Sequence, residues 1–200
     1  MKTTILIVIA ILQFSLAVAQ SEIKEPANAC SVQLQKHKIY IFCRGTTLKQ
    51  HLVSNAFNII DSNVTHVGIG YLDNYKIKIF NVTNVSRVQN SLKVEDFESF
   101  ISIDDAFYYS IWELNMGNMF FRRVKKILSE SVCHRVSFDY AFLLNNGDSL
   151  YCSEFCAEVI NAVKKIVVPT KKAFNNKLYE AILGRVSLEY YPVDFFVNNN

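Results

Sequence analysis

The chain has 200 residues, half of them hydrophobic, which is enough for one compact domain with a full core and too little for two ordinary domains. Its 21 Lys and Arg residues against 18 Asp and Glu residues give a formal net charge of +3. The basic residues are spread along the sequence, whereas nucleic-acid binding favours a basic stripe, so we expect a single domain that binds no nucleic acid.

The first 19 residues have the pattern of a signal peptide. Lys2 provides a positive start, residues 5–18 are almost all apolar, and Ala17-Val18-Ala19 forms an A-x-A cleavage site. The apolar run is short for a bilayer span of about 20 residues, although a retained membrane anchor stays an alternative. We predict cleavage after Ala19, a secreted or periplasmic domain over residues 20–200, and no stable transmembrane segment.

Hydrophobic periodicity predicts a mixture of strands and helices in the rest of the chain. Two of the predicted strands are joined at Asp73-Asn74, a favourable two-residue turn. In chain order the pattern predicts a strand over 38–43, a helix over 48–60, strands over 65–72 and 75–82, a helix over 94–101, a strand over 107–114, and helices over 118–130 and 149–166.

Five cysteines fall in a chain that we expect to be exported, where disulfides can persist. An odd count leaves at least one thiol free in a monomer, and that thiol is either reactive or simply buried. The cysteines are Cys30, Cys43, Cys133, Cys152 and Cys156.

Cys152 lies in the first turn of the predicted 149–166 helix. If Ser149 is the N-cap, Cys152 takes the third helical position, where unpaired backbone N–H groups and the helix dipole lower the pKa of a thiol. The same N–H groups can bind a developing oxyanion. A cysteine in this position is more often a packing residue than a nucleophile, so the assignment needs a partner base. The inward stripe of the helix consists of Cys152, Phe155, Cys156, Val159, Ile160 and Val163.

Four histidines are candidates for that base. His37 and His51 have the surroundings of surface residues, and His134 follows Cys133 in a predicted loop, which makes it a weaker rival. His66 opens an apolar strand whose Gly68 and Gly70 leave the histidine face almost bare, with room for a helix that carries the nucleophile. The alternative is a strand-end histidine satisfied by a local hydrogen bond.

Three sets of residues, in this order, resemble a known family. They are His66-Val67-Gly68-Ile69, then residues 138–142 (FDYAF), then residues 151–155 (YCSEF). Together with a strand at residues 39–42 and the closing segment YPVDF, they are similar to the permuted papain-like enzymes of the YiiX and YaeF type, relatives of the NlpC/P60 cell-wall hydrolases. The resemblance covers roughly residues 38–196.

The resemblance implies an α+β, papain-like fold, circularly permuted, with an antiparallel sheet packed against the helix that carries the cysteine. It assigns the nucleophile to Cys152 and the base to His66. The third, orienting residue of the family lies on the next strand, where this chain has Asn81 instead of the expected glutamate. An asparagine can also hold an imidazole. We expect no cofactor and no metal.

Counting across the turn leads to the same third residue. If Asp73 and Asn74 form the loop, Leu72 pairs with Tyr75 and His66 then faces Asn81, close enough for the amide oxygen to accept a hydrogen bond. A slip of one residue turns Asn81 to the far face. Asn81 also begins one of three glycosylation sequons, and a glycan there would remove it from the site; the sequons begin at Asn63, Asn81 and Asn84.

The chemistry that we expect is hydrolysis of an amide bond in a peptide or cell-wall-type substrate through a Cys152 acyl-enzyme, with His66 as the base. Two alternatives stay open. The related lecithin retinol acyltransferase branch uses similar parts on lipid esters, which makes a lipid acyl hydrolase or acyltransferase the second candidate. The third is a catalytically inactive binding domain of the same fold, because Asn81 replaces a carboxylate.

Overall fold

The structure is a computed structural model that describes residues 34–47, 56–84, 90–102, 106–147 and 149–197. The predicted signal peptide, Cys30, His51 and most of the predicted 48–60 helix lie outside these residues, and within that helix only Ala56 and Phe57 are described as helical. Within the described ranges, no helix combines the length and the apolar character that crossing a membrane requires.

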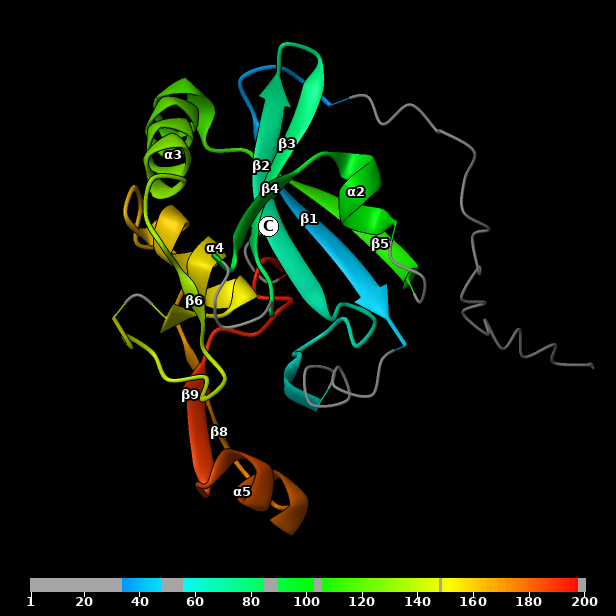
Figure 1. Ribbon diagram of the computed structural model, residues 1–200, viewed down its shortest axis with the longest axis vertical. Coiled ribbons are helices and arrows are strands. Elements are labelled where there is room, and N and C mark those ends of the chain that lie inside the picture. The colour runs from blue at the N-terminus through cyan, green and yellow to red at the C-terminus, as the bar shows by residue number, and fades with distance from the viewer. Residues whose placement is uncertain (1–33, 48–55, 85–89, 103–105, 148, 198–200) are drawn as a thin grey trace, which may run out of the picture.

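A five-stranded antiparallel sheet forms the centre of the fold, in the order β4-β3-β2-β1-β5. Its strands are β1 (Ile39–Thr46), β2 (His66–Asp73), β3 (Lys76–Val82), β4 (Leu92–Glu95) and β5 (Ala106–Leu114). Helices α3 (Gly117–Ser131) and α4 (Cys152–Asn161) lie on one side of the sheet, and the short α2 (Phe97–Ile101) lies on the other (Figure 1). The α+β, permuted papain-like fold expected from the sequence is confirmed.

The predicted 94–101 helix is wrong in its first half. Residues Leu92–Glu95 form β4 against β3, and Asp96 then caps α2 by accepting a hydrogen bond from the Ser99 N–H at 2.7 Å. Aspartate is a strong N-cap residue, so the helix begins only after it. Five short elements were missing from the prediction: β6 (Ser137–Phe138), β7 (Ser149–Leu150), β8 (Thr170–Ala173), α5 (Lys177–Leu183) and β9 (Ser187–Tyr190).

The two faces of the sheet bury different clusters. Val67, Ile69 and Tyr71 pack in the main core with Cys152, Phe155 and Cys156 of α4 and with α3. The opposite face carries a smaller cluster of Tyr40, Phe42, Ile79 and Phe100. Antiparallel pairing sets Gly68 against Phe42 and Gly70 against Tyr40 and Ile79, so both glycines belong to this second face.

The prediction that the face with Gly68 and Gly70 makes room for the helix carrying the cysteine is therefore wrong. A Cβ atom at Gly68 would lie 2.7 Å from Ile79 Cγ2, and one at Gly70 would lie 2.1 Å from the Lys78 carbonyl oxygen. The glycines are needed for close approach of β3, while the helix packs on the branched residues of the other face.

The turn between β2 and β3 lies one residue later than predicted. Asp73 pairs with Lys76, and the loop residues Asn74 and Tyr75 have φ angles of 48° and 65°. Positive φ at both positions is what a tight hairpin turn with the twist of a sheet requires. The pairing therefore differs from the prediction by two residues, which keeps every side chain on its predicted face.

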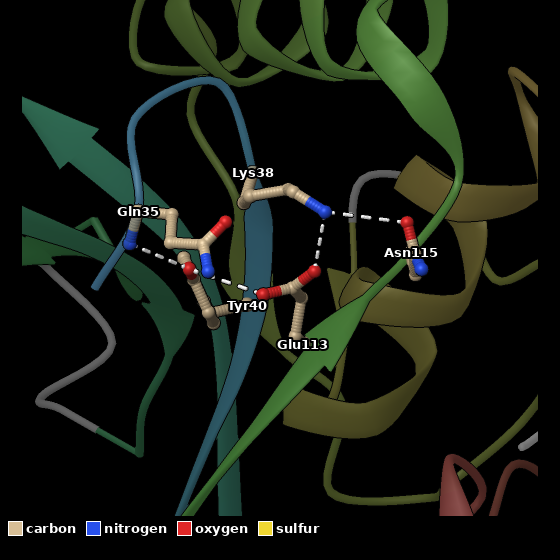
Figure 2. A network of polar contacts seen from close by, with 5 residues as sticks. All are labelled: Gln35, Lys38, Tyr40, Glu113 and Asn115. Carbon is tan, nitrogen blue, oxygen red and sulfur yellow. Dashed lines mark hydrogen bonds and ion pairs between the residues drawn. The ribbon is translucent and has the colours of Figure 1, made fainter. Parts of the chain in front are cut away.

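Polar side chains join β1 to β5 at one end of the sheet (Figure 2). Lys38 Nζ donates to Glu113 Oε1 at 2.5 Å and to Asn115 Oδ1 at 3.2 Å, and the Tyr40 hydroxyl donates to Glu113 Oε2 at 3.4 Å. The backbone N–H of Gln35 donates to the Tyr40 oxygen at 2.8 Å. These contacts fasten the start of β1 next to the end of β5.

Strands β8 and β9, with α5 between them, form an extension at one end of the molecule (Figure 1). A third buried cluster lies at its base, where aromatic rings meet edge to face. The cluster consists of Phe57, Tyr151, Phe174, Leu188 and Tyr190. Through Tyr151, the residue before Cys152, it reaches the start of α4.

Candidate active site

Cys152 is the first residue of α4, two positions earlier in the helix than expected. Ser149 and Leu150 form β7, and Tyr151, not Ser149, is the N-cap, with an extended backbone. The Tyr151 hydroxyl accepts a hydrogen bond from the Tyr191 N–H at 2.8 Å, and the Tyr151 ring packs in the cluster of Phe57, Phe174, Leu188 and Tyr190. A tyrosine cannot cap with its side chain, so the sequence carried no capping signal at this position.

Burial dominates the electrostatics of the Cys152 thiol. Cys152 is 8% exposed, and desolvation raises the pKa of its thiol, whereas the sequence predicted a lowered pKa. Backbone N–H groups of Val67, Ser153 and Cys152 itself act in the opposite direction, as does the positive charge of Arg44. These donors favour a negative charge at this point, but the resting thiol keeps its proton.

His66 lies at the start of β2, among groups that keep its ring neutral. Burial, followed by the nearby charge of Arg44, lowers the pKa of His66 to about 3. Arg44 is the β1 partner of His66, and its guanidinium lies 4.7 Å from the centre of the Phe100 ring. The His66 ring contacts the same phenyl ring, with centres 5.8 Å apart. A neutral imidazole has one nitrogen free to accept a proton, as a general base requires.

His66 and Asn81 form the hydrogen bond that the sequence suggested. His66 Nε2 and Asn81 Oδ1 are 3.0 Å apart, and Asn81 is fully buried. Because the pairing is shifted by two residues, Asn81 is a diagonal neighbour of His66 and not its direct opposite. Diagonal neighbours on one face are within reach of a long side chain, which explains how the contact survives the shift.

The structure brings Cys152 to the strand that carries His66 without joining the two side chains. The Cys152 thiol lies at the backbone N–H of Val67, the residue after His66. Among the described residues, no hydrogen bond links the thiol to the imidazole. The His66 and Asn81 side chains lie on the Phe100 face of the sheet, and α4 packs on the other. Nucleophile–base contacts are often long before substrate binds.

The other histidines and cysteines have separate places. His37 is exposed, as expected, and His134, the weaker rival for the base, is exposed too. Cys43, Cys133, Cys152 and Cys156 are all free thiols, so no disulfide joins the four described cysteines, and the expectation of a disulfide gains no support from them. Burial raises the pKa of Cys43 and of Cys156 well above the ordinary value, which makes both unreactive.

The neighbours of Cys152 hold the first turn of α4, a role that the sequence did not reveal. Ser153 Oγ donates to the Tyr191 carbonyl at 2.7 Å, and the Asn145 N–H donates to Glu154 Oε1 at 3.2 Å. The segments 139–147 and 191–194 thereby support the helix start on two sides. Only tertiary contacts could have revealed this, because serine and glutamate in a first turn are ordinary helix residues.

Glu154 is fully buried, although the sequence placed it off the inward stripe of the helix. Its Oε2 atom has no hydrogen-bond partner among the described residues. Burial, followed by the charge of Glu158, raises the pKa of Glu154 to about 7 from an ordinary 4.5. The folded protein thus holds a proton on Glu154 that the unfolded chain releases at lower pH. The stability due to this proton is complete below pH 4.5 and is lost as the pH rises through about 7.

Replacing Glu154 with glutamine should remove this pH dependence. Between pH 5 and pH 8 we expect the melting temperature of Glu154→Gln to fall less than that of the wild type, because an amide of the same shape does not ionise. Thermal unfolding monitored by circular dichroism at several pH values measures both curves. Glu189→Gln, at an exposed position, is the control and should follow the wild type. Parallel curves for Glu154→Gln and the wild type would contradict the assignment.

Within the described residues, no group of three or more His, Cys, Asp or Glu side chains is arranged to hold a metal ion. The candidate site residues described above are a thiol (Cys152), an imidazole (His66) and a buried amide (Asn81).

Comparisons with known proteins identify the family of this chain and a similar fold. Residues 42–192 match the family described as permuted papain-like amidase enzyme, YaeF/YiiX, C92 family. The crystal structure of the metalloprotein YiiX from Escherichia coli O157:H7 has a similar fold, with a TM-score of 0.62 and 13% sequence identity over 82% of this chain and 93% of that one. No curated protein sequence gives a match. With three quarters of its length matched, this chain belongs to the permuted papain-like amidase family of YaeF and YiiX.

Proposed function

We propose that this protein is a thiol amidase in which Cys152 is the nucleophile, His66 the base and Asn81 the residue that orients His66. One observation carries the proposal: Cys152 begins α4 with three backbone N–H groups around its thiol, next to the strand whose His66 is hydrogen-bonded to Asn81. Membership of a papain-like amidase family gives the reaction type. A buried thiol surrounded by N–H donors is suited to stabilising negative charge.

The resting pair is neutral, so the thiol loses its proton during attack. Cys152 Sγ forms a bond to the carbonyl carbon of the substrate, and a backbone N–H at the helix start stabilises the oxyanion. Because the thiol and the imidazole are not in contact in the resting site, the thiol proton passes to His66 Nδ1 through a bridging water molecule. The carbon–nitrogen bond then breaks, and the amine leaves with the proton from His66. Water next attacks the thioester and gives a proton to His66, which returns it to Cys152. The products are a carboxylic acid and an amine.

A peptide amide is the proposed substrate class, because the family is one of amidases. A lipid or other acyl ester is the alternative, since the same thioester can form from either bond. The absence of a hydrogen bond between Cys152 and His66 among the described residues favours a further candidate, an inactive binding domain. The proposed chemistry draws on side chains and backbone of this chain alone.

We also propose that the protein acts outside the cytoplasm. The support is the positive start, apolar run and A-x-A site of residues 1–19, which is the pattern of a cleaved signal peptide. Peptides of the cell-wall type would be met in that compartment.

Trapping the acyl-enzyme tests the proposal. The wild type, Cys152→Ala and Cys156→Ala are incubated with a panel of peptide-amide and acyl-ester probes, and intact mass reports the adduct. We expect an acyl adduct in the wild type and Cys156→Ala, mapped by peptide sequencing to Cys152, and none in Cys152→Ala. Adducts from esters alone would favour the lipid alternative. No adduct and no turnover with any probe would favour the binding domain.

A further inference from the structure

Glu95 is the last residue of β4, directly before the Asp96 that caps α2. Strand β4 pairs with β3 so that Ile79 opposes Glu95 and Asn81 opposes Lys93. Glu95 therefore projects on the same face of the sheet as Asn81, one diagonal step away. Its Oε2 atom accepts a hydrogen bond from Asn81 Nδ2 at 3.0 Å. The buried amide of Asn81 thus has a carboxylate on one side and the His66 ring on the other.

This arrangement fixes which way the Asn81 amide points. A carboxylate oxygen accepts hydrogen bonds, so the NH₂ group of Asn81 must face Glu95 and its carbonyl oxygen must face His66. A carbonyl oxygen also only accepts, so His66 Nε2 must carry the ring proton. The neutral imidazole is then left with its lone pair on Nδ1. Since Asn81 is 0% exposed, protein partners and not solvent decide its orientation.

We propose that Glu95 is a positioning residue that sets the tautomer of His66 through Asn81. The catalytic consequence, a lone pair on Nδ1 for the Cys152 proton, rests on the function proposed above. In the absence of Glu95, the Asn81 amide can turn over and donate to Nε2 instead. The ring proton would then lie on Nδ1, the nitrogen that must act as base, and proton transfer from the thiol would be blocked.

The backbone around Glu95 is held on both sides, which suits a residue that positions others. Strand pairing holds it to β3, and the Asp96 cap fixes the following turn. Five residues after Glu95, Phe100 packs against the His66 ring, and the Phe100 carbonyl oxygen accepts a hydrogen bond from Arg44 Nη1 at 2.5 Å. One short segment therefore supplies both the carboxylate behind Asn81 and the aromatic ring against His66.

Two residues thus take the place of the glutamate expected on the strand after the histidine. Asn81 contacts the imidazole, and Glu95, one strand further, contacts Asn81.

The arrangement also bears on the glycosylation sequon that Asn81 begins. In the folded protein both ends of this side chain are engaged and buried, so a glycan and the active-site role exclude each other.

The tautomer of His66 can be read directly by two-bond ¹⁵N–¹H correlation spectra at neutral pH, with His66→Ala identifying its signals. We expect the wild type to show the Nε2-protonated form alone, and Glu95→Ala to show a population protonated on Nδ1. In a Cys133→Ser background, which removes the exposed thiol among the described residues, iodoacetamide should alkylate Cys152 about 10-fold more slowly after Glu95→Ala, as read from the label mapped to Cys152. Glu98→Gln, exposed in the same segment, is the control and should leave both measurements unchanged.

Glu95→Gln keeps the test valid if the alanine variant does not fold. Two facing amides form the same number of hydrogen bonds in either orientation, so a second tautomer is expected there as well. A His66 spectrum identical to that of the wild type in a folded Glu95 variant would overturn the inference. A shifted tautomer together with a wild-type Cys152 that no probe acylates would leave the positioning role intact and refute the proposed function.

Discussion

Replacing His66 with alanine should lower turnover of a peptide-amide probe by at least about 10²-fold, the usual size of a lost general base. Burial and the nearby Arg44 hold the ring neutral, so a proton acceptor is ready at neutral pH. Without the ring, the raised pKa of Cys152 leaves the thiol protonated. The loss should fall on kcat, because the imidazole acts in the chemical step. Initial rates over a range of substrate concentrations measure it.

His134→Ala is the matched control, because this histidine is exposed and lies in the loop after α3. Its rate should equal that of the wild type. Circular dichroism establishes that both variants are folded before the rates are compared. Equal losses in the two folded variants would make His134 the base and would remove His66 from the mechanism.

Hydrophobic periodicity was sufficient for the longer elements of the fold. Strands β1, β2, β3 and β5 and helix α3 all lie where the pattern predicted them, within a few residues at each end. Each of these elements has one face in a buried cluster. Burial of one face produces apolar residues at regular spacing in the sequence, and this spacing is what the prediction used. The short strands β6 to β9 have two to four residues, which is too few for an alternating hydrophobic pattern to be recognised.

The start of α4 shows how tertiary contacts override local signals. Ser149 is a good N-cap by residue type, yet it pairs in parallel with Ser137 as part of β7. The helix begins after Tyr151, which has no capping side chain and is held by Tyr191 from 40 residues away. The predicted lowering of the Cys152 pKa failed for a related reason. The sequence indicated the backbone N–H donors at the start of the helix, but it did not indicate how deeply Cys152 is buried.

The His66 and Asn81 contact was within reach of sequence reasoning, whereas Glu95 was not. A two-residue error in the hairpin left both side chains on one face, because strand faces alternate with a period of two. Glu95 was assigned to a helix, so its pairing across β3 had no place in the prediction. The orienting group of a catalytic residue thus depends on strand register, which is the feature that sequence alone specifies least.

Asp194 should make one of the largest contributions to stability of any polar side chain in this fold. Its carboxylate is fully buried and accepts hydrogen bonds from the backbone N–H groups of Ile59, Ile60 and Asp61, at distances from 2.6 to 3.0 Å. Asp194→Ala leaves these three donors without their acceptor. We expect it to lower the free energy of unfolding by about 3 to 5 kcal/mol, since hydrogen bonds to charged groups are strong and unsatisfied donors are costly.

Urea unfolding followed by circular dichroism measures this loss, and two further variants define its origin. Asp194→Asn keeps one acceptor oxygen but turns an NH₂ group toward the donors, so its stability should lie between those of the wild type and the alanine variant. Glu130→Ala removes an exposed carboxylate from α3 and should change stability by less than about 0.5 kcal/mol. The segment that Asp194 holds leads directly into β2 and His66. Asp194→Asn should therefore lose activity at a lower temperature than the wild type. If a folded Asp194→Ala variant had the stability of the wild type, the three hydrogen bonds would contribute nothing to stability.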